Sequence, residues 1–151
     1  MIETPEIIQT EAQSMACLQV TVAREEIRNV MGPGLNEVMG ALADQGIEPS
    51  GPWFTHHYRI VPDIFEFEIC VPVSTAVQPV GRVQPGVWPA MTVARTVYSG
   101  PYGKLGEAWN AFNDWVSANG YEPEDDLWER YVASPPSAPR TELNRPLKPR
   151  R

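Results

Sequence analysis

The sequence predicts an α+β fold, in which antiparallel strands and two helices form a single domain over residues 1–151. The chain is long enough for one sizeable core, and its 42% of hydrophobic residues argues against disorder over most of its length. Segments that alternate apolar and polar residues flank two segments with apolar residues at helical spacing. The order of these segments is repeated, which indicates an internal duplication.

The first half of the chain is predicted to run strand, helix, strand, strand. Residues 15–23 (MACLQVTVA) alternate apolar and polar side chains and are rich in valine, as half-buried strands are. Residues 34–46 carry apolar side chains at helical spacing and close with a glycine, which predicts a helix and its end. Strands follow over residues 51–60 and 63–73, because the Val-Pro-Asp sequence where they meet favours a turn.

The second half repeats this order. Residues 88–100 are predicted to form a strand, and residues 100–120 a helix with a proline near its start and a glycine at its end. Residues 127–134 and 141–147 supply two more strands. The duplicated unit therefore covers about 5–74 in the first copy and about 86–148 in the second.

Matching strings support the duplication. GIEP in the first copy matches GYEP in the second, and EICVPV matches ELNRPL, both at an offset of 74 residues. A unit of this size covers one sheet face with its own helix and leaves the other face unprotected. We therefore expect antiparallel sheets with helices on one face, a pseudo-two-fold axis between the copies, and a central ligand cleft at the seam.

The side chains expected in that cleft follow from strand alternation. One inserted residue in the second copy matches Trp53 to Trp128 and places Glu129 where the first copy has Phe54. If the two tryptophans anchor the strands under the helices, the alternate side chains face the seam. That set consists of Phe54, His56, Tyr58, Glu129 and Tyr131.

Aromatic walls around one carboxylate suit a flat, hydrophobic and cationic molecule, because ring faces and the acid both attract a cation. Held away from water, Glu129 is expected to resist ionisation until such a partner arrives. The alternative is that Glu129 pairs with Arg95 or Arg130 on the surface. Three further aromatic residues are expected either to line the cleft or to fill the core: Trp88, Tyr98 and Tyr102. Two further acids, Glu68 and Glu142, are expected either to add to an acidic lining or to be solvated on the sheet face.

The sequence predicts neither a metal site nor a cofactor. His56 and His57 are neighbours on a strand and point to opposite faces, so they cannot easily share an ion. Cys17 and Cys70 are isolated and are interpreted as small core residues. The sequence contains no P-loop, G-x-G-x-x-G turn or G-x-S-x-G elbow.

Charge and hydropathy limit the kinds of partner that the sequence predicts. The formal net charge is -7, which disfavours direct binding to DNA. Five of the twelve basic residues lie in the last twelve positions and are interpreted as a solubilising or disordered tail: Arg140, Arg145, Lys148, Arg150 and Arg151. The chain has neither an apolar run long enough for a bilayer nor a signal peptide, so we expect a cytoplasmic protein without membrane contact.

The strings DIFEFEICVPV, YSGPYGKLGEAWNAFNDWV, LWERYVASP and RTELNRPL together resemble the GyrI-like small-molecule-binding family, which includes effector-binding domains of bacterial multidrug-responsive regulators. The resemblance covers nearly the whole chain. It implies two strand–helix–strand–strand units around an aromatic cleft, with an acid deep in the cleft that meets cationic ligands. The family's Trp-Glu-x-Tyr string places that acid on Glu129 and the tyrosine on Tyr131. Tyr98 is a departure, because relatives often carry a histidine there.

Three functions follow as expectations. The first is a stand-alone protein that binds planar or amphipathic, often cationic compounds, for drug sensing, sequestration or protection. The second is a hydrolase that opens cyclopropane-type DNA-alkylating compounds, as similar stand-alone relatives do, with Glu129 and Tyr131 as catalytic residues. The third is an interaction with a partner protein, as in relatives linked to DNA gyrase inhibition. Only about fifteen residues precede the first predicted strand, so we expect no helix-turn-helix.

Overall fold

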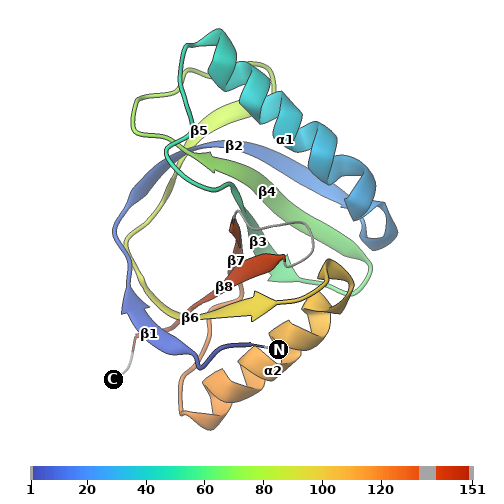
Figure 1. Ribbon diagram of the computed structural model, residues 1–151, viewed down its shortest axis with the longest axis vertical. Helices are drawn as coiled ribbons and strands as arrows, with labels where there is room; N and C mark the ends of the chain where they lie inside the picture. The colour runs from blue at the N-terminus through green and yellow to red at the C-terminus, as the bar shows by residue number, and fades with distance from the viewer. Residues whose placement is uncertain (1, 133–138, 150–151) are drawn as a thin grey trace.

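The computed structural model describes residues 2–132 and 139–149. These residues form one eight-stranded antiparallel sheet with two helices, which confirms the α+β class (Figure 1). The strands are β1 (Glu6–Gln9), β2 (Gln13–Ala23), β3 (Phe54–Ile60), β4 (Ile64–Pro72), β5 (Val83–Trp88), β6 (Thr92–Ser99), β7 (Leu127–Val132) and β8 (Arg140–Pro146). The helices are α1 (Ile27–Asp44) and α2 (Leu105–Ala118), each preceded by a short 3-10 turn.

The strand order is β1-β6-β8-β7-β3-β4-β2-β5. The unit β2-α1-β3-β4 and the unit β6-α2-β7-β8 therefore occupy reversed positions on either side of the β3–β7 pair, as a two-fold relation would place them. The edge strands β1 and β5 were not predicted from the sequence. β5 contains Pro85 and Gly86, residues that weaken a strand pattern and are tolerated at a sheet edge.

Both helices cover the same face of the sheet, here called the helix face. α1 packs Val38 and Leu42 against Phe67 and Ile69 of the first unit, and α2 packs its own apolar residues against Leu143 of the second. Burying each such side chain contributes about 1.5 to 3 kcal/mol. Figure 1 shows the sheet curling so that the helices lie on its outer side. The opposite side is called the inner face.

The inner face carries a third cluster, built on aromatic rings. The rings of Trp88 and Trp128 stack with centroids 4.3 Å apart, and His56 stacks on the other side of Trp128 at 3.8 Å. Phe54 packs against both tryptophans. Because Trp128 is 1% exposed, this layered stack holds the middle strands together on the side that no helix covers.

The pairing of β3 with β7 corrects the predicted match between the two copies. Thr55 is the direct partner of Glu129, and Phe54 and Trp128 share the inner face. Trp53 instead contacts Tyr131 and the core under α1. Matching Trp53 to Trp128 was therefore wrong, because a slip of one residue moves a strand's side chains to the opposite face.

Helix α1 begins earlier than predicted. It starts at Ile27 and includes Pro33, which the sequence analysis treated as lying before the helix. Gly34 is buried against β4, and a methyl group there would clash with the side chain of Ile69. Gly46 and Gly120 follow the two helices with φ of 68° and 79°, which confirms them as helix stops.

Three of the basic residues near the end of the chain, Arg140, Arg145 and Lys148, make ordered contacts and are not part of a disordered tail. Arg140 begins β8 and pairs with Glu3, and Arg145 donates to the carbonyl oxygen of Glu124. Lys148 pairs with Glu122, while residues 150 and 151 lie outside the described part.

Neither α1 nor α2 is both long enough and apolar enough to cross a lipid bilayer.

Candidate functional site

Glu129 is a buried carboxylate on the helix face of β7, with 7% of its surface exposed. Its Oε2 accepts a hydrogen bond of 2.6 Å from Nε1 of Trp109, which α2 brings over the sheet. Its Oε1 accepts one of 2.8 Å from the hydroxyl of Tyr131, two residues further along the same strand. Both donors are uncharged, so the acid is solvated by the protein but not neutralised by it.

A chain of hydroxyl groups continues from Glu129 to β3. The hydroxyl of Tyr131 lies 2.9 Å from Oγ1 of Thr55, which is fully buried. The ring of Trp53 packs against Tyr131 with centroids 4.3 Å apart and the planes tilted by 34°, and the more exposed Tyr102 meets Tyr131 edge-on at 6.3 Å. The buried acid is thus followed outward by half-buried and then exposed aromatic rings.

His57 completes the surroundings of the acid without forming an ion pair. Its Nε2 lies 4.0 Å from Oε1 of Glu129. Burial, with the charges of His56 and Arg24 adding to it, lowers the pKa of His57 to about 4. The ring is therefore neutral near pH 7. In the described part of the chain, no charged cation lies within ion-pair distance of Glu129.

The surroundings of Glu129 and Tyr131 favour the protonated form of both side chains. Burial raises the pKa of Glu129, and the hydrogen bonds from Trp109 and Tyr131 only partly oppose this effect. Burial and the adjacent carboxylate raise the pKa of Tyr131 well above its ordinary value. A cation placed here would stabilise the carboxylate form of Glu129, and a reacting molecule could exchange a proton with it.

The alternative pairing of Glu129 with a surface arginine was wrong. Arg95 and Arg130 lie on the inner face, where both pair with Glu142, at 3.3 Å and 3.2 Å. Glu142 is therefore neither solvated nor part of the surroundings of Glu129. Because Arg130 is the direct neighbour of Glu129 in β7, strand alternation keeps the two side chains on opposite faces.

The predicted set of cleft residues does not lie on one face. Phe54 is fully buried in the aromatic stack of the inner face. His56 lies there too and bonds Glu68 at 3.1 Å and Asp126 at 2.7 Å, and the Tyr58 hydroxyl donates to Glu68. Grouping Phe54, His56 and Tyr58 with Glu129 and Tyr131 was wrong, because the match between the two copies was shifted by one residue, which exchanges the two faces of a strand. His56 and His57 do point to opposite faces, as predicted.

The remaining aromatic residues divide between the two faces. Tyr98 is 3% exposed and packs in the core under α2, where its hydroxyl donates to the carbonyl oxygen of Pro101. Tyr102 is 56% exposed and reaches toward Tyr131. Trp88 lies on the inner face. Of these three, Tyr102 alone contacts the group around Glu129 in the described structure.

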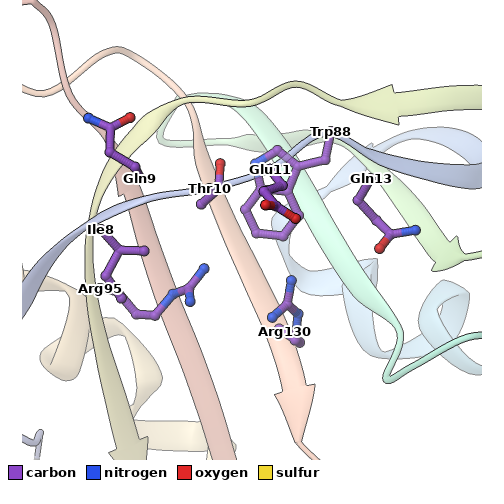
Figure 2. A pocket seen from close by; sticks show the side chains of 8 residues that line it. All are labelled: Ile8, Gln9, Thr10, Glu11, Gln13, Trp88, Arg95 and Arg130. Carbon is purple, nitrogen blue, oxygen red and sulfur yellow. The ribbon is translucent and has the colours of Figure 1, made fainter.

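Within residues 2–132 and 139–149, the inner face contains two hollows, and Glu129 lines neither of them. One of about 270 Å³ is lined by Trp88, Arg95 and Arg130 together with residues from the end of β1 to the start of β2. Figure 2 shows both guanidinium groups pointing into this hollow, and that of Arg130 lies 5.1 Å from the centre of the Trp88 ring. A second hollow of about 560 Å³ lies beside β2 and β5. Its lining includes Cys17 and Glu68.

Cys17 and Cys70 lie in the buried cluster of the inner face, as expected of core residues, although they are far apart in the sequence. They are direct partners across β2 and β4, and both are buried. Glu68 lies on the same side of β4, and the three potential ligand atoms lie within 4.8 Å of one another.

Comparison with known proteins agrees with this architecture. The model of the GyrI-like small molecule binding domain matches residues 3–148. The chain belongs to the GyrI-like family. No curated protein matches this member of the family.

Solved structures of other proteins share the fold at low identity. The EcmrR C-terminal domain is 21% identical, with a TM-score of 0.83 over 96% of this chain and 97% of that one. In the EcmrR–DNA complex, the similar part covers 57% of the EcmrR chain. SAV2435 bound to tetraphenylphosphonium is 10% identical, with a TM-score of 0.66 over 97% and 94% of the chains. A hydrolase encoded by lin2189 from Listeria innocua is 10% identical, with a TM-score of 0.65 over 95% and 91%.

The sequence analysis missed three members of the group around Glu129, namely Trp109, Thr55 and His57. Keeping the offset of 74 residues without an insertion would have placed Thr55 on Glu129 and His57 on the same face. Trp109 gave no such signal, because its spacing from Phe112 and Val116 is that of an ordinary helix core.

Proposed function

We propose that this GyrI-like protein binds hydrophobic organic cations on the helix face, against Glu129, in drug sensing, sequestration or protection. The observation that carries the proposal is a buried carboxylate whose hydrogen-bond donors are both neutral. An incoming cation supplies the charge that the fold leaves out. A paired, desolvated charge of this kind contributes about 1.5 to 3 kcal/mol to binding.

The aromatic rings beside the acid support the same ligand class. Trp53 and Tyr102 each lie in ring contact with Tyr131, which is hydrogen-bonded to the buried acid. Their faces attract cations, and their area provides hydrophobic contact for an aryl ligand. Because directional polar groups are few here, the site is expected to accept several ligands of this type. SAV2435, which has the same fold, was solved with the lipophilic cation tetraphenylphosphonium.

Tryptophan positions allow a test that separates the two faces. Titration with tetraphenylphosphonium should quench the intrinsic fluorescence of Trp53 and Trp109, and Trp109→Phe should reduce the quenching and change the affinity. Trp88→Phe, the matched control on the inner face, should leave the affinity unchanged. The opposite pattern would place the ligand in the inner hollow beside Trp88 and contradict the proposal.

A hydrolytic function at the same residues is the second candidate. The hydrogen-bonded series of Thr55, Tyr131 and Glu129 favours it, because it joins a carboxyl group of raised pKa to a hydroxyl donor. In the opening of an electrophilic cyclopropane, water would bond to a ring carbon and lose a proton to Glu129. The breaking C–C bond would send its electron pair into the conjugated acceptor, with Tyr131 donating a hydrogen bond to the developing charge. The acceptor would then take up the proton from Glu129, which restores the carboxylate and completes the addition of one water.

Product mass distinguishes the two functions. The protein is incubated with a cyclopropane-bearing alkylator, and the compound is followed by mass spectrometry over many turnovers. A gain of one water, lost in Glu129→Gln while binding persists, identifies the hydrolase. Fluorescence quenching without any change of mass identifies the binding protein.

A further inference from the structure

The pair Cys17 and Cys70, with Glu68, forms a compact group of potential ligands on the inner face. The two cysteines face each other across β2 and β4, and Glu68 is two residues from Cys70 on the same side of its strand. One ligand atom from each residue lies within 4.8 Å of the others. Cys17 is 5% exposed, Cys70 is fully buried and Glu68 is 9% exposed.

Outer hydrogen bonds already orient the carboxylate of this group. His56 Nδ1 lies 3.1 Å from Oε1 of Glu68, and the hydroxyl of Tyr58 donates to Oε2 at 3.0 Å. Asp126 holds the other ring nitrogen of His56 at 2.7 Å. Each carboxylate oxygen retains lone pairs beyond these bonds. Supporting partners of this kind are what fix the ligands of metal sites in proteins.

The group is reachable from the second inner hollow. Cys17 and Glu68 both line this hollow of about 560 Å³. Arg82 lies in the same lining, but its guanidinium is engaged by Glu37 at 2.7 Å. An ion can therefore approach the two residues through the hollow, whereas Cys70 forms the closed end of the group.

The geometry points to a metal site in which Cys17, Cys70 and Glu68 bind a thiophilic divalent cation of the Zn²⁺ or Cd²⁺ type, with a fourth position open to the hollow. Two sulfur ligands disfavour Mg²⁺ and Ca²⁺, which prefer oxygen, and three protein ligands leave one tetrahedral position for water. Zn–S bonds of about 2.3 Å require the sulfurs to lie roughly 3.8 Å apart, which is compatible with ligand atoms that lie within 4.8 Å of one another. Each bound ion displaces the protons of both thiols, which enter the solvent.

Cadmium provides a test on the unmodified protein. The reduced chain, with two titratable thiols, is titrated with Cd²⁺ while thiolate-to-metal charge-transfer absorption and proton release are recorded. We expect saturation at one ion per chain and the release of about two protons per ion. A chain that binds Cd²⁺ without the charge-transfer band, or reduced thiols that combine into a disulfide instead of binding, would overturn the proposal.

Variants then assign the ligands. Cys17→Ser should remove most of the absorption, and Glu68→Gln should weaken Cd²⁺ at least tenfold. Gly86→Ala, which changes no ligand, should also weaken it, because the added methyl group would clash with the sulfur of Cys17. Glu66→Gln is the matched control on β4 and should bind as the wild type does, provided that circular dichroism shows all variants folded. Equal binding by Cys17→Ser and the wild type would contradict the assignment.

Discussion

Thr55 on β3 and Glu129 on β7 are direct partners in the sheet, and the hydroxyl of Tyr131 hydrogen-bonds to both side chains. The offset of 74 residues that relates the repeated strings also relates these two positions. A two-fold relation between the copies would therefore pass through this pair. Thr55 and Glu129 are both buried where the two units join, with the short hydroxyl side chain beside the carboxylate.

Loss of the Tyr131 hydroxyl should destabilise the fold. In Tyr131→Phe, Thr55 and Glu129 each lose a partner while both stay buried, which we expect to cost about 1 to 3 kcal/mol of unfolding free energy in urea. Tyr102→Phe is the control, because its ring is 56% exposed. Similar losses in both variants would show that the buried hydroxyl chain contributes no stability.

Cation binding should depend on pH through Glu129. Burial raises its pKa in the folded protein, and below that pKa the neutral acid attracts no cation. Affinity for tetraphenylphosphonium is therefore expected to rise with pH through the pKa of Glu129, by at most about tenfold per pH unit, and then level off. Calorimetric titrations of Glu129→Gln should show no such rise. A wild-type affinity that is constant with pH would count against the charge pairing.

His57 should make the fold sensitive to acid. Its pKa is about 4 in the folded protein against 6.5 for the free side chain, chiefly because burial disfavours the charged ring. The unfolded chain thus binds the proton more readily, and the stabilisation present above pH 6.5 is lost as the pH falls toward 4. Relative to His57→Gln, the wild type should lose up to about 3 kcal/mol across this window. A difference that does not vary with pH would show that folding leaves the pKa of His57 unshifted.

Truncating the aromatic stack of the inner face should cost more unfolding free energy than truncating Trp53 on the helix face. Trp128→Ala removes the ring between Trp88 and His56 and should cost about 3 to 5 kcal/mol in chemical denaturation. Trp53→Ala is expected to cost less, because that side chain is only half-buried. An equal or reversed order would mean that the inner stack adds little to the core.

Much of the fold could be predicted because the helical spacing and the strand alternation of apolar residues are both local patterns in the sequence. Helical spacing before Gly46 and Gly120 and the alternation in β2, β4 and β6 are properties of neighbouring residues. β5 was not predicted because Pro85 and Gly86 interrupt its alternating pattern. It forms a strand by pairing with the edge of β2. The early start of α1 was missed because Pro33 is more often found before a helix or in its first turn.

The site could be predicted only in part. Glu129 and Tyr131 were singled out by residue type, but the face they share depends on strand register, and one inserted residue reversed it. Trp109 joins them through the packing of α2, which the helix pattern does not encode. Cys17 and Cys70 are brought together because β2 pairs with β4, a relation between distant segments that no local pattern records.

Calorimetric titration of three proteins with a matched pair of ligands tests the central claim most directly. The wild type, Glu129→Gln and Glu142→Gln are titrated with tetraphenylphosphonium and with neutral triphenylphosphine oxide. Glu129→Gln should weaken the cation by about 1.5 to 3 kcal/mol and the neutral compound much less, while Glu142→Gln, on the opposite face, should leave both unchanged. Equal losses for the cation and the neutral compound in Glu129→Gln, or a loss for the cation confined to Glu142→Gln, would contradict binding against the buried acid of β7.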